Sequence, residues 1–227
     1  MQAIGGWDRP DVAQAQLTLV TSELAHMDIV GPFVAFRWAL QQIEPSKGMM
    51  MLGTTLLDVG CGVGHYGVLC ERYYPGLLYH GSDVYEPMIE RARLLAPLGR
   101  FSVCPFEDND FGAYDIVLIS QVVETMHNPP AMLRLALGLC KHIVILNRIR
   151  LTLDASHAIE ETTYCGNVGR EWLWNMAELR KLVADYGTVR YCSIWDNDNE
   201  ATLVVEVNCD ESAGLCSCAN TATCQST

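Results

Sequence analysis

Apolar residues recur along the chain in two alternating patterns, one typical of buried strands and one typical of helices. The strand-like runs are short and rich in branched or aromatic residues: Thr54–Val59, Leu77–Gly81, Phe101–Cys104, Tyr114–Ser120, His142–Asn147, Val189–Trp195 and Thr202–Val207. The helix-like runs lie between them: Val63–Tyr74, Glu86–Ala96, Pro129–Leu139 and Met176–Tyr186. Alternation of this kind favours a parallel sheet with helices on both faces.

The last two strand-like runs depart from this pattern. Only the polar stretch Asp196–Glu200 separates them, which is too short for a crossover between parallel strands. We therefore predict an α/β fold with a Rossmann-like, doubly wound, seven-stranded sheet. The sheet should be mostly parallel and should end in an antiparallel hairpin.

The first part of the chain has helical spacing of apolar residues from 11 to 44, interrupted at Gly31-Pro32. We predict two helices and assign residues 1–48 as a helical lid, residues 49–208 as the main domain and residues 209–227 as a separate tail. The connection Arg148–Trp172 is long, as functional loops tend to be. We expect it to close over the functional site together with the helical lid.

Composition excludes some partners. The chain has 227 residues, enough for one main domain, and a formal net charge of −12 with only 15 Lys and Arg. Binding to a nucleic-acid backbone or to an anionic membrane requires a basic face, so we expect neither partner. Met27–Leu40 is too short and too charged to span a bilayer, and the first residues lack the pattern of a signal peptide. We expect a cytoplasmic protein.

A glycine-rich turn follows the first predicted strand. Residues 56–67 read LLDVGCGVGHYG, a buried strand that runs through glycines into a helix. The spacing Gly62-x-Gly64-x-x-Gly67 also satisfies the dinucleotide pattern of dehydrogenases. Asp58 argues against that alternative, because a carboxylate at the end of the strand would repel a pyrophosphate and favour a cationic ligand. Asp83, at the end of the second strand, could accept hydrogen bonds from both ribose hydroxyls.

These features resemble the class I S-adenosylmethionine-dependent methyltransferase family. The resemblance spans roughly residues 50–207 and keeps the order of the family's motifs. The matching segments are residues 56–64 (LLDVGCGVG), 81–93 (GSDVYEPMIERAR), 106–108 (FED), 114–117 (YDIV) and 173–179 (LWNMAEL).

The resemblance implies S-adenosyl-L-methionine as cofactor and assigns a binding role to each part of the main domain. Asp58 and the backbone from Gly60 to Gly64 would hold the methionyl part, Asp83 the ribose, and Phe106 with Glu107 the adenine. The predicted cofactor-binding residues are Asp58, Gly60, Cys61, Gly62, Gly64, Asp83, Val84, Phe106, Glu107 and Gln121. Pro105 departs from the family, which often has an adenine-binding acid there.

The residues that act on the acceptor are less evident. His127 and Glu124 follow the fourth predicted strand, and either could remove a proton from a hydroxyl or an amine. His127 can also be an ordinary residue ahead of a helix cap at Asn128. We predict methyl transfer to oxygen or nitrogen of a small molecule, without a metal, and keep a non-catalytic cofactor-binding module as the alternative. The oligomeric state is left open.

Two further segments invite other interpretations: one contains two prolines and the other is the cysteine-rich tail. Asn128-Pro129-Pro130 is similar to the signature of amino-methyltransferases, but Ala131 replaces the aromatic residue that should follow. A helix cap with proline at the first helical position explains this motif without such chemistry and is the interpretation we favour. The tail holds Cys209, Cys216, Cys218 and Cys224, which fit disorder, a metal or soft-ligand site, or disulfides.

Overall fold

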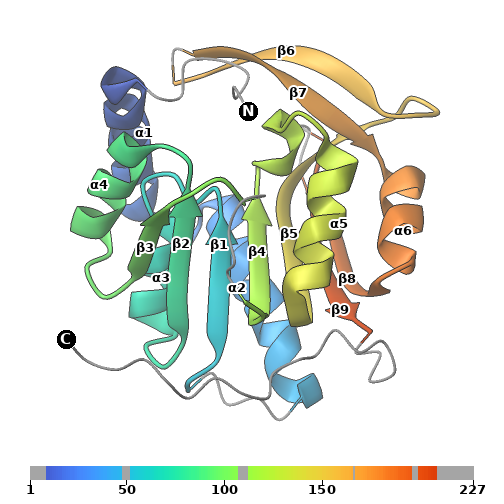
Figure 1. The fold of residues 1–227 in the computed structure, drawn as a ribbon, viewed down its shortest axis with the longest axis horizontal. Helices are drawn as coiled ribbons and strands as arrows, with labels where there is room; N and C mark the ends of the chain where they lie inside the picture. The colour runs from blue at the N-terminus through green and yellow to red at the C-terminus, as the bar shows by residue number, and fades with distance from the viewer. Residues whose placement is uncertain (1–8, 48–51, 107–111, 166, 196–198, 209–227) are drawn as a thin grey trace.

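The computed structural model describes residues 9–47, 52–106, 112–165, 167–195 and 199–208, which form one mixed sheet flanked by helices (Figure 1). The strands are β1 (Thr55–Val59), β2 (Leu78–Asp83), β3 (Arg100–Val103), β4 (Tyr114–Ser120), β5 (Cys140–Thr152), β6 (Ala158–Tyr164), β7 (Asn167–Asn175), β8 (Gly187–Trp195) and β9 (Glu200–Val207). The helices are α1 (Pro10–Leu24), α2 (Gly31–Lys47), α3 (His65–Tyr73), α4 (Glu86–Leu95), α5 (Pro129–Leu139) and α6 (Met176–Ala184), with a short 3₁₀ turn, η2 (Val123–Thr125).

The seven predicted strands are confirmed, in the order β3-β2-β1-β4-β5-β9-β8. The pairs from β3 to β5 are parallel, whereas β9 pairs antiparallel with both β5 and β8. The predicted terminal hairpin is therefore present. The order reverses between β1 and β4, which is where open α/β sheets bind ligands beyond the carboxyl ends of their strands.

The segment from Arg148 to Trp172 differs from the long connection predicted for it. Strand β5 continues to Thr152, and β6 and β7 form an antiparallel hairpin that joins the end of β5 through Leu151 and Thr152. Figure 1 shows this hairpin arching above the carboxyl ends of the parallel strands. The sequence of β6, AIEETTY, has few apolar residues and is largely exposed, so it lacks the hydrophobic signal of a core strand.

The core has two layers, one on each face of the sheet. Successive strand residues point to opposite faces, so Leu56 and Ile116 pack with α1 to α4, and their neighbours Leu57 and Val117 pack with α5 and α6. All four side chains are fully buried. Helices therefore cover both faces of the sheet, which confirms the predicted doubly wound fold.

The two N-terminal helices have different surroundings. The buried side chains of α2, among them Phe36 and Leu40, belong to the core beneath β5 and β9. Helix α1 instead packs on α4 at the edge of the sheet. Helix α2 is thus part of the core, and the covering role predicted for residues 1–48 stays a prediction. No helix in the described ranges has the length and apolar content needed to cross a bilayer.

The Asn128-Pro129-Pro130 motif starts a helix. Asn128 Oδ1 accepts a hydrogen bond from the Ala131 N–H (3.2 Å), and Pro129 begins α5. The motif therefore has a structural explanation in its helix cap. The four cysteines of the tail lie outside the described residues.

Candidate functional site

The glycine turn joins β1 to α3 and depends on backbone conformations that other residues rarely adopt. Gly60, Gly62 and Gly64 have φ angles of +66°, +53° and +83°. A Cβ atom at Gly60 would lie 2.5 Å from Val122 Cγ1, closer than two carbon atoms can approach. The turn is therefore both left-handed and tightly packed, and it can bring backbone N–H groups close to a ligand.

Asp83 stands at the carboxyl end of β2 and faces this turn. Its carboxylate accepts hydrogen bonds from the N–H groups of Gly62 (2.9 Å) and Tyr85 (3.0 Å). Burial raises its pKa to about 6, although these backbone hydrogen bonds act in the opposite direction. Asp83 lines a cavity of about 510 Å³, here called the inner cavity.

Asp58 lies beneath the turn and does not line the inner cavity. Its carboxylate accepts a hydrogen bond from Tyr79 Oη (2.5 Å), and burial raises its pKa to about 7. Cys61 and Gly64 also lie outside the cavity lining, with Cys61 only 1% exposed. In this arrangement Asp58 is bonded to Tyr79 of β2, and a direct contact with the cofactor stays a prediction.

The inner cavity gathers most of the other predicted cofactor residues. It is lined by Gly60, Gly62, Asp83, Val84, Phe106 and Gln121, together with His127 at its rim. Glu107 lies outside the described residues. Helix α1 contributes Gln16, Val20 and Glu23, and a Cβ atom at Gly62 would lie 2.7 Å from Gln16 Oε1. A turn that only glycine can form, a carboxylate opposite it and an apolar Phe106 wall fit the amino-acid, ribose and adenine parts of S-adenosylmethionine.

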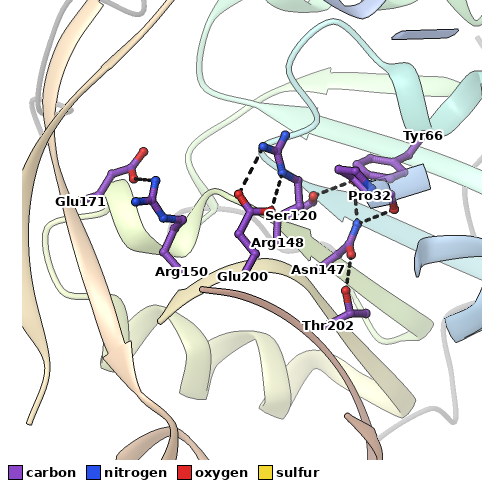
Figure 2. Close-up of polar contacts among 9 residues, drawn as sticks. All are labelled: Pro32, Tyr66, Ser120, Asn147, Arg148, Arg150, Glu171, Glu200 and Thr202. Atoms are coloured by element: carbon purple, nitrogen blue, oxygen red, sulfur yellow. Dashed lines mark hydrogen bonds and ion pairs between the residues drawn. The ribbon is translucent and has the colours of Figure 1, made fainter. Parts of the chain in front are cut away.

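A hydrogen-bonded network centred on Asn147 connects Tyr66 of α3 with Pro32 of α2 and with Thr202 of β9 (Figure 2). Asn147 donates to Tyr66 Oη (2.7 Å) and to the Pro32 carbonyl (3.1 Å), and it accepts from Thr202 Oγ1 (2.7 Å). Tyr66 Oη and Ser120 Oγ are 2.8 Å apart, so Tyr66 can donate its proton to Ser120. Burial raises the pKa of Tyr66, which keeps it neutral. The network fixes Tyr66 and Ser120, both of which line the inner cavity.

Two non-glycine residues on neighbouring stretches of the sheet have left-handed backbones. Gln121, directly after β4, and Arg148, within β5, have φ angles of +52° and +56°. The Gln121 N–H donates to the Asn147 carbonyl (3.1 Å), and the pairing of β5 with β9 shifts register between Leu146 and Ile149. Such an irregularity re-aims a side chain, and here it turns Arg148 toward the site. Arg148 pairs with Glu200 through Nε–Oε2 (3.2 Å) and Nη2–Oε1 (3.4 Å).

A second cavity of about 740 Å³, here called the outer cavity, lies between the end of β5 and the β6–β7 hairpin. It shares four lining residues with the inner cavity: Gln121, Arg148, Tyr164 and Glu171. Arg150 Nη1 contacts Glu171 Oε2 at 3.3 Å (Figure 2). The two cavities therefore meet at a polar boundary.

The two predicted bases have different positions. His127 is exposed and lines the inner cavity. Glu124 is 2% exposed, lines neither cavity, and neither of its carboxyl oxygens has a hydrogen-bond partner within the described part of the chain. Burial, with Glu171 nearby, raises the pKa of Glu124 to about 8, so it is largely protonated at neutral pH.

Several residues that line the inner cavity were not predicted from the sequence, among them Gln16, Glu23, Arg148 and Glu171. Gln16 and Glu23 share a helix face with the buried Val20, and polar residues on such a face are the signal that could have found them. Arg148 follows the apolar run from Ile143 to Leu146 within β5, and Arg150 comes two residues later. Glu171 had no comparable signal, because its strand was predicted as part of a connection.

Comparison with known proteins identifies the domain type. Residues 57–142 match the family model described as a methyltransferase domain. A search of curated proteins gives no match. The part of the chain that matches the family model includes the glycine turn, Asp83, the point where the strand order reverses and the start of β5.

Solved structures share the fold at low sequence identity. Magnesium protoporphyrin IX methyltransferase from Synechocystis with bound SAH is 18% identical with a TM-score of 0.60, over 78% of this chain and 83% of that one. An amino pentose methyltransferase from Micromonospora echinaspora with bound SAM is 16% identical with a TM-score of 0.59, over 83% and 97%. A sugar N-methyltransferase from a Streptoalloteichus species is 13% identical with a TM-score of 0.57, over 75% and 85%.

Proposed function

The chain carries a class I S-adenosylmethionine-dependent methyltransferase domain, and on this premise we propose that it methylates oxygen or nitrogen of a small molecule bound where the inner and outer cavities meet. The observation that supports this most strongly is the shared boundary at Gln121, Arg148, Tyr164 and Glu171. An acceptor in the outer cavity would there lie next to a cofactor in the inner one.

The inner cavity has the size and lining for the cofactor. Its volume of about 510 Å³ lies in the usual range for small-molecule sites, about 300–1,000 Å³. Gly60 and Gly62 would hold the amino-acid part through their backbone, Asp83 the ribose, and Phe106 the adenine. When bound, S-adenosylmethionine supplies a methyl group activated by the positive sulfur.

The chain's own residues contribute orientation, exclusion of water and a proton acceptor. Helix α1 reaches the glycine turn through Gln16, and the β6–β7 hairpin covers the strand ends. Both restrict water near the reacting atoms. His127 is the candidate base that lines the inner cavity, and a neutral imidazole there can accept a proton from the acceptor. Glu124, buried behind the cavity wall, is better placed for a structural role.

The neighbouring structures add support for a small acceptor. They include a magnesium protoporphyrin IX methyltransferase, an amino pentose methyltransferase and a sugar N-methyltransferase. The cytoplasmic location inferred from the sequence stays part of this proposal.

The test combines cofactor binding with methyl transfer. Calorimetry should show binding of S-adenosylhomocysteine, and Asp83→Ala should weaken it by about 1–3 kcal/mol through loss of charge-assisted hydrogen bonds. The exposed Asp185→Ala variant, which lines neither cavity, is the control. Radiolabelled S-adenosylmethionine should then label a member of a metabolite panel. Tight cofactor binding with no labelled product under any condition would favour the non-catalytic module instead.

A further inference from the structure

The outer cavity has an unusual wall of paired charges. Arg148 pairs with Glu200, and Arg150 pairs with both Glu171 (3.3 Å) and Glu160 (3.5 Å). These pairs hold guanidinium donors and carboxylate acceptors side by side in defined positions. Such a surface suits a ligand that carries several groups able both to donate and to accept hydrogen bonds, as hydroxyls do.

The remainder of the wall is also mainly polar. Thr152, Thr162 and Thr163 add hydroxyl groups, and the apolar contribution comes from three leucines, Leu151, Leu153 and Leu173. Trp172 stacks on His157 (ring centroids 3.7 Å apart) and is not part of the lining. A large flat apolar acceptor would leave these polar groups without partners, which disfavours its binding.

The charges in the outer cavity do not balance. Its lining holds two arginines, Arg148 and Arg150, against the four carboxylates of Asp154, Glu160, Glu171 and Glu200. On the inner side of the boundary, Glu23 adds a further carboxylate. The excess of negative charge favours a cationic group on the ligand and disfavours phosphate or carboxylate.

Glu171 is the best placed of these carboxylates to receive a cation. It lies at the boundary of both cavities, and its side chain is 5% exposed. Arg150 binds Oε2, whereas Oε1 has no hydrogen-bond partner among the residues that the structure describes. An ammonium group at Oε1 would complete its hydrogen bonding in a site largely removed from water.

Backbone strain at Arg148 supports a role in binding. A left-handed conformation at a non-glycine residue is unfavourable and persists where the surroundings enforce it, often at functional sites. Here it places the guanidinium on the boundary between the cavities, where it can donate to a ligand hydroxyl while held by Glu200.

We propose that the outer cavity binds the methyl acceptor and that this acceptor is a polyhydroxylated amine, with its ammonium at Glu171 and its hydroxyls against Arg148 and Arg150. The inference rests on the proposed function and names the class of its substrate. The nucleophile can be a hydroxyl oxygen of such a molecule, or its nitrogen after the ammonium has given up a proton, because an ammonium has no free electron pair.

The experiment compares related ligands in the presence of saturating S-adenosylhomocysteine. Calorimetry should detect binding of D-glucosamine, and N-acetyl-D-glucosamine, which lacks the cation, should bind at least about tenfold more weakly. D-glucosamine 6-phosphate should also bind more weakly, because its phosphate meets the carboxylate excess. Protoporphyrin IX, a flat apolar acid, should not compete with D-glucosamine.

Glu171→Gln should weaken D-glucosamine binding by about tenfold or more while leaving N-acetyl-D-glucosamine unchanged. Glu161→Gln is the matched control: the same substitution on β6 at an exposed residue that lines neither cavity. It should bind both sugars as the wild type does.

The outcomes separate this inference from the proposed function. Equal affinity for the amine and its N-acetyl derivative, or unchanged D-glucosamine affinity in Glu171→Gln, would overturn the inference. Binding of S-adenosylhomocysteine and labelling of an unrelated acceptor, with no affinity for D-glucosamine, would overturn it too and leave the proposed function standing. Absence of cofactor binding would remove the proposed function itself, and this inference with it.

Discussion

The inner and outer cavities are built in different ways. The inner cavity depends on the backbone of one short stretch, Gly60 to Gly64, and on Asp83 at the end of the adjacent strand. The outer cavity depends on side-chain pairs whose members lie far apart in the sequence, such as Arg148 with Glu200, 52 residues later. The glycine turn on the cofactor side is therefore formed by residues that are close in sequence. The charge pairs on the acceptor side form only when distant strands pair.

This difference determines how each side should respond to substitution. A glycine turn has no room for an added atom, so a single methyl group should disrupt it. A wall of charge pairs can change one member and keep the fold, because most of its residues lie at the ends of strands and on an added hairpin. Cofactor binding should thus be intolerant of change, and acceptor recognition should be adjustable.

Gly60→Ala should have the largest effect. The new methyl group would clash with Val122, and the alanine backbone would have to adopt a φ angle of +66°. We therefore expect the free energy of unfolding to fall by about 2–4 kcal/mol. Cofactor affinity should fall with it. Urea unfolding and calorimetry measure both. Gly112→Ala is the control, because Gly112 has the same φ of +66° but nothing within 4 Å of its would-be Cβ atom. Equal losses in the two variants would show that backbone strain alone, and not the contact with Val122, makes the turn intolerant.

Glu124→Gln should remove a pH dependence of the free energy of unfolding that arises from the buried Glu124 carboxyl group. The pKa of Glu124 rises from 4.5 to about 8 on folding because of burial, then because of nearby Glu171 and Glu200. The folded state then keeps a proton that the unfolded state loses, so stability falls as pH rises between these two values, by up to about 1.4 kcal/mol per pH unit. Between pH 5 and pH 7 the wild type should lose about 2–3 kcal/mol more than the variant.

Urea unfolding at several pH values measures that difference, and the exposed Glu161→Gln variant should follow the wild type. Parallel pH curves for Glu124→Gln and the wild type would mean that Glu124 ionises normally in the folded protein. Methyl transfer should persist in Glu124→Gln, and its loss would restore Glu124 as a candidate base.

Arg148→Met should have a smaller effect on stability. It leaves the Glu200 carboxylate, whose side chain is 10% exposed, without its paired cation, and we expect a loss of about 1–2 kcal/mol. Arg190→Met removes the partner of Glu206 from a pair whose arginine is 62% exposed, and it should cost less than about 1 kcal/mol. Thermal or urea unfolding of both variants gives the comparison. Similar losses from the two would show that the Arg148–Glu200 pair behaves as an ordinary surface pair.

Much of the architecture could be read from local patterns. Leu56 and Leu57 belong to a short apolar run with turn residues on either side, and such runs predict buried strands because both faces of a parallel sheet are covered. The polar stretch before Glu200 was too short for a crossover, which settled the antiparallel hairpin. The glycines and Asp83 marked the cofactor edge because backbone conformation and strand ends are properties of neighbouring residues.

The acceptor side could not be read in this way. Strand β6 is polar and exposed, so its sequence resembles a loop, and it becomes a strand only by pairing with β7. Arg148 turns toward the site because β5 shifts register against β9, and Glu171 reaches the boundary because β7 joins the end of β5. By itself, then, the sequence determined the parallel sheet, its terminal hairpin and the glycine turn. Only the tertiary structure decided which charged side chains meet, because an ion pair between distant residues leaves no periodic signal along the chain.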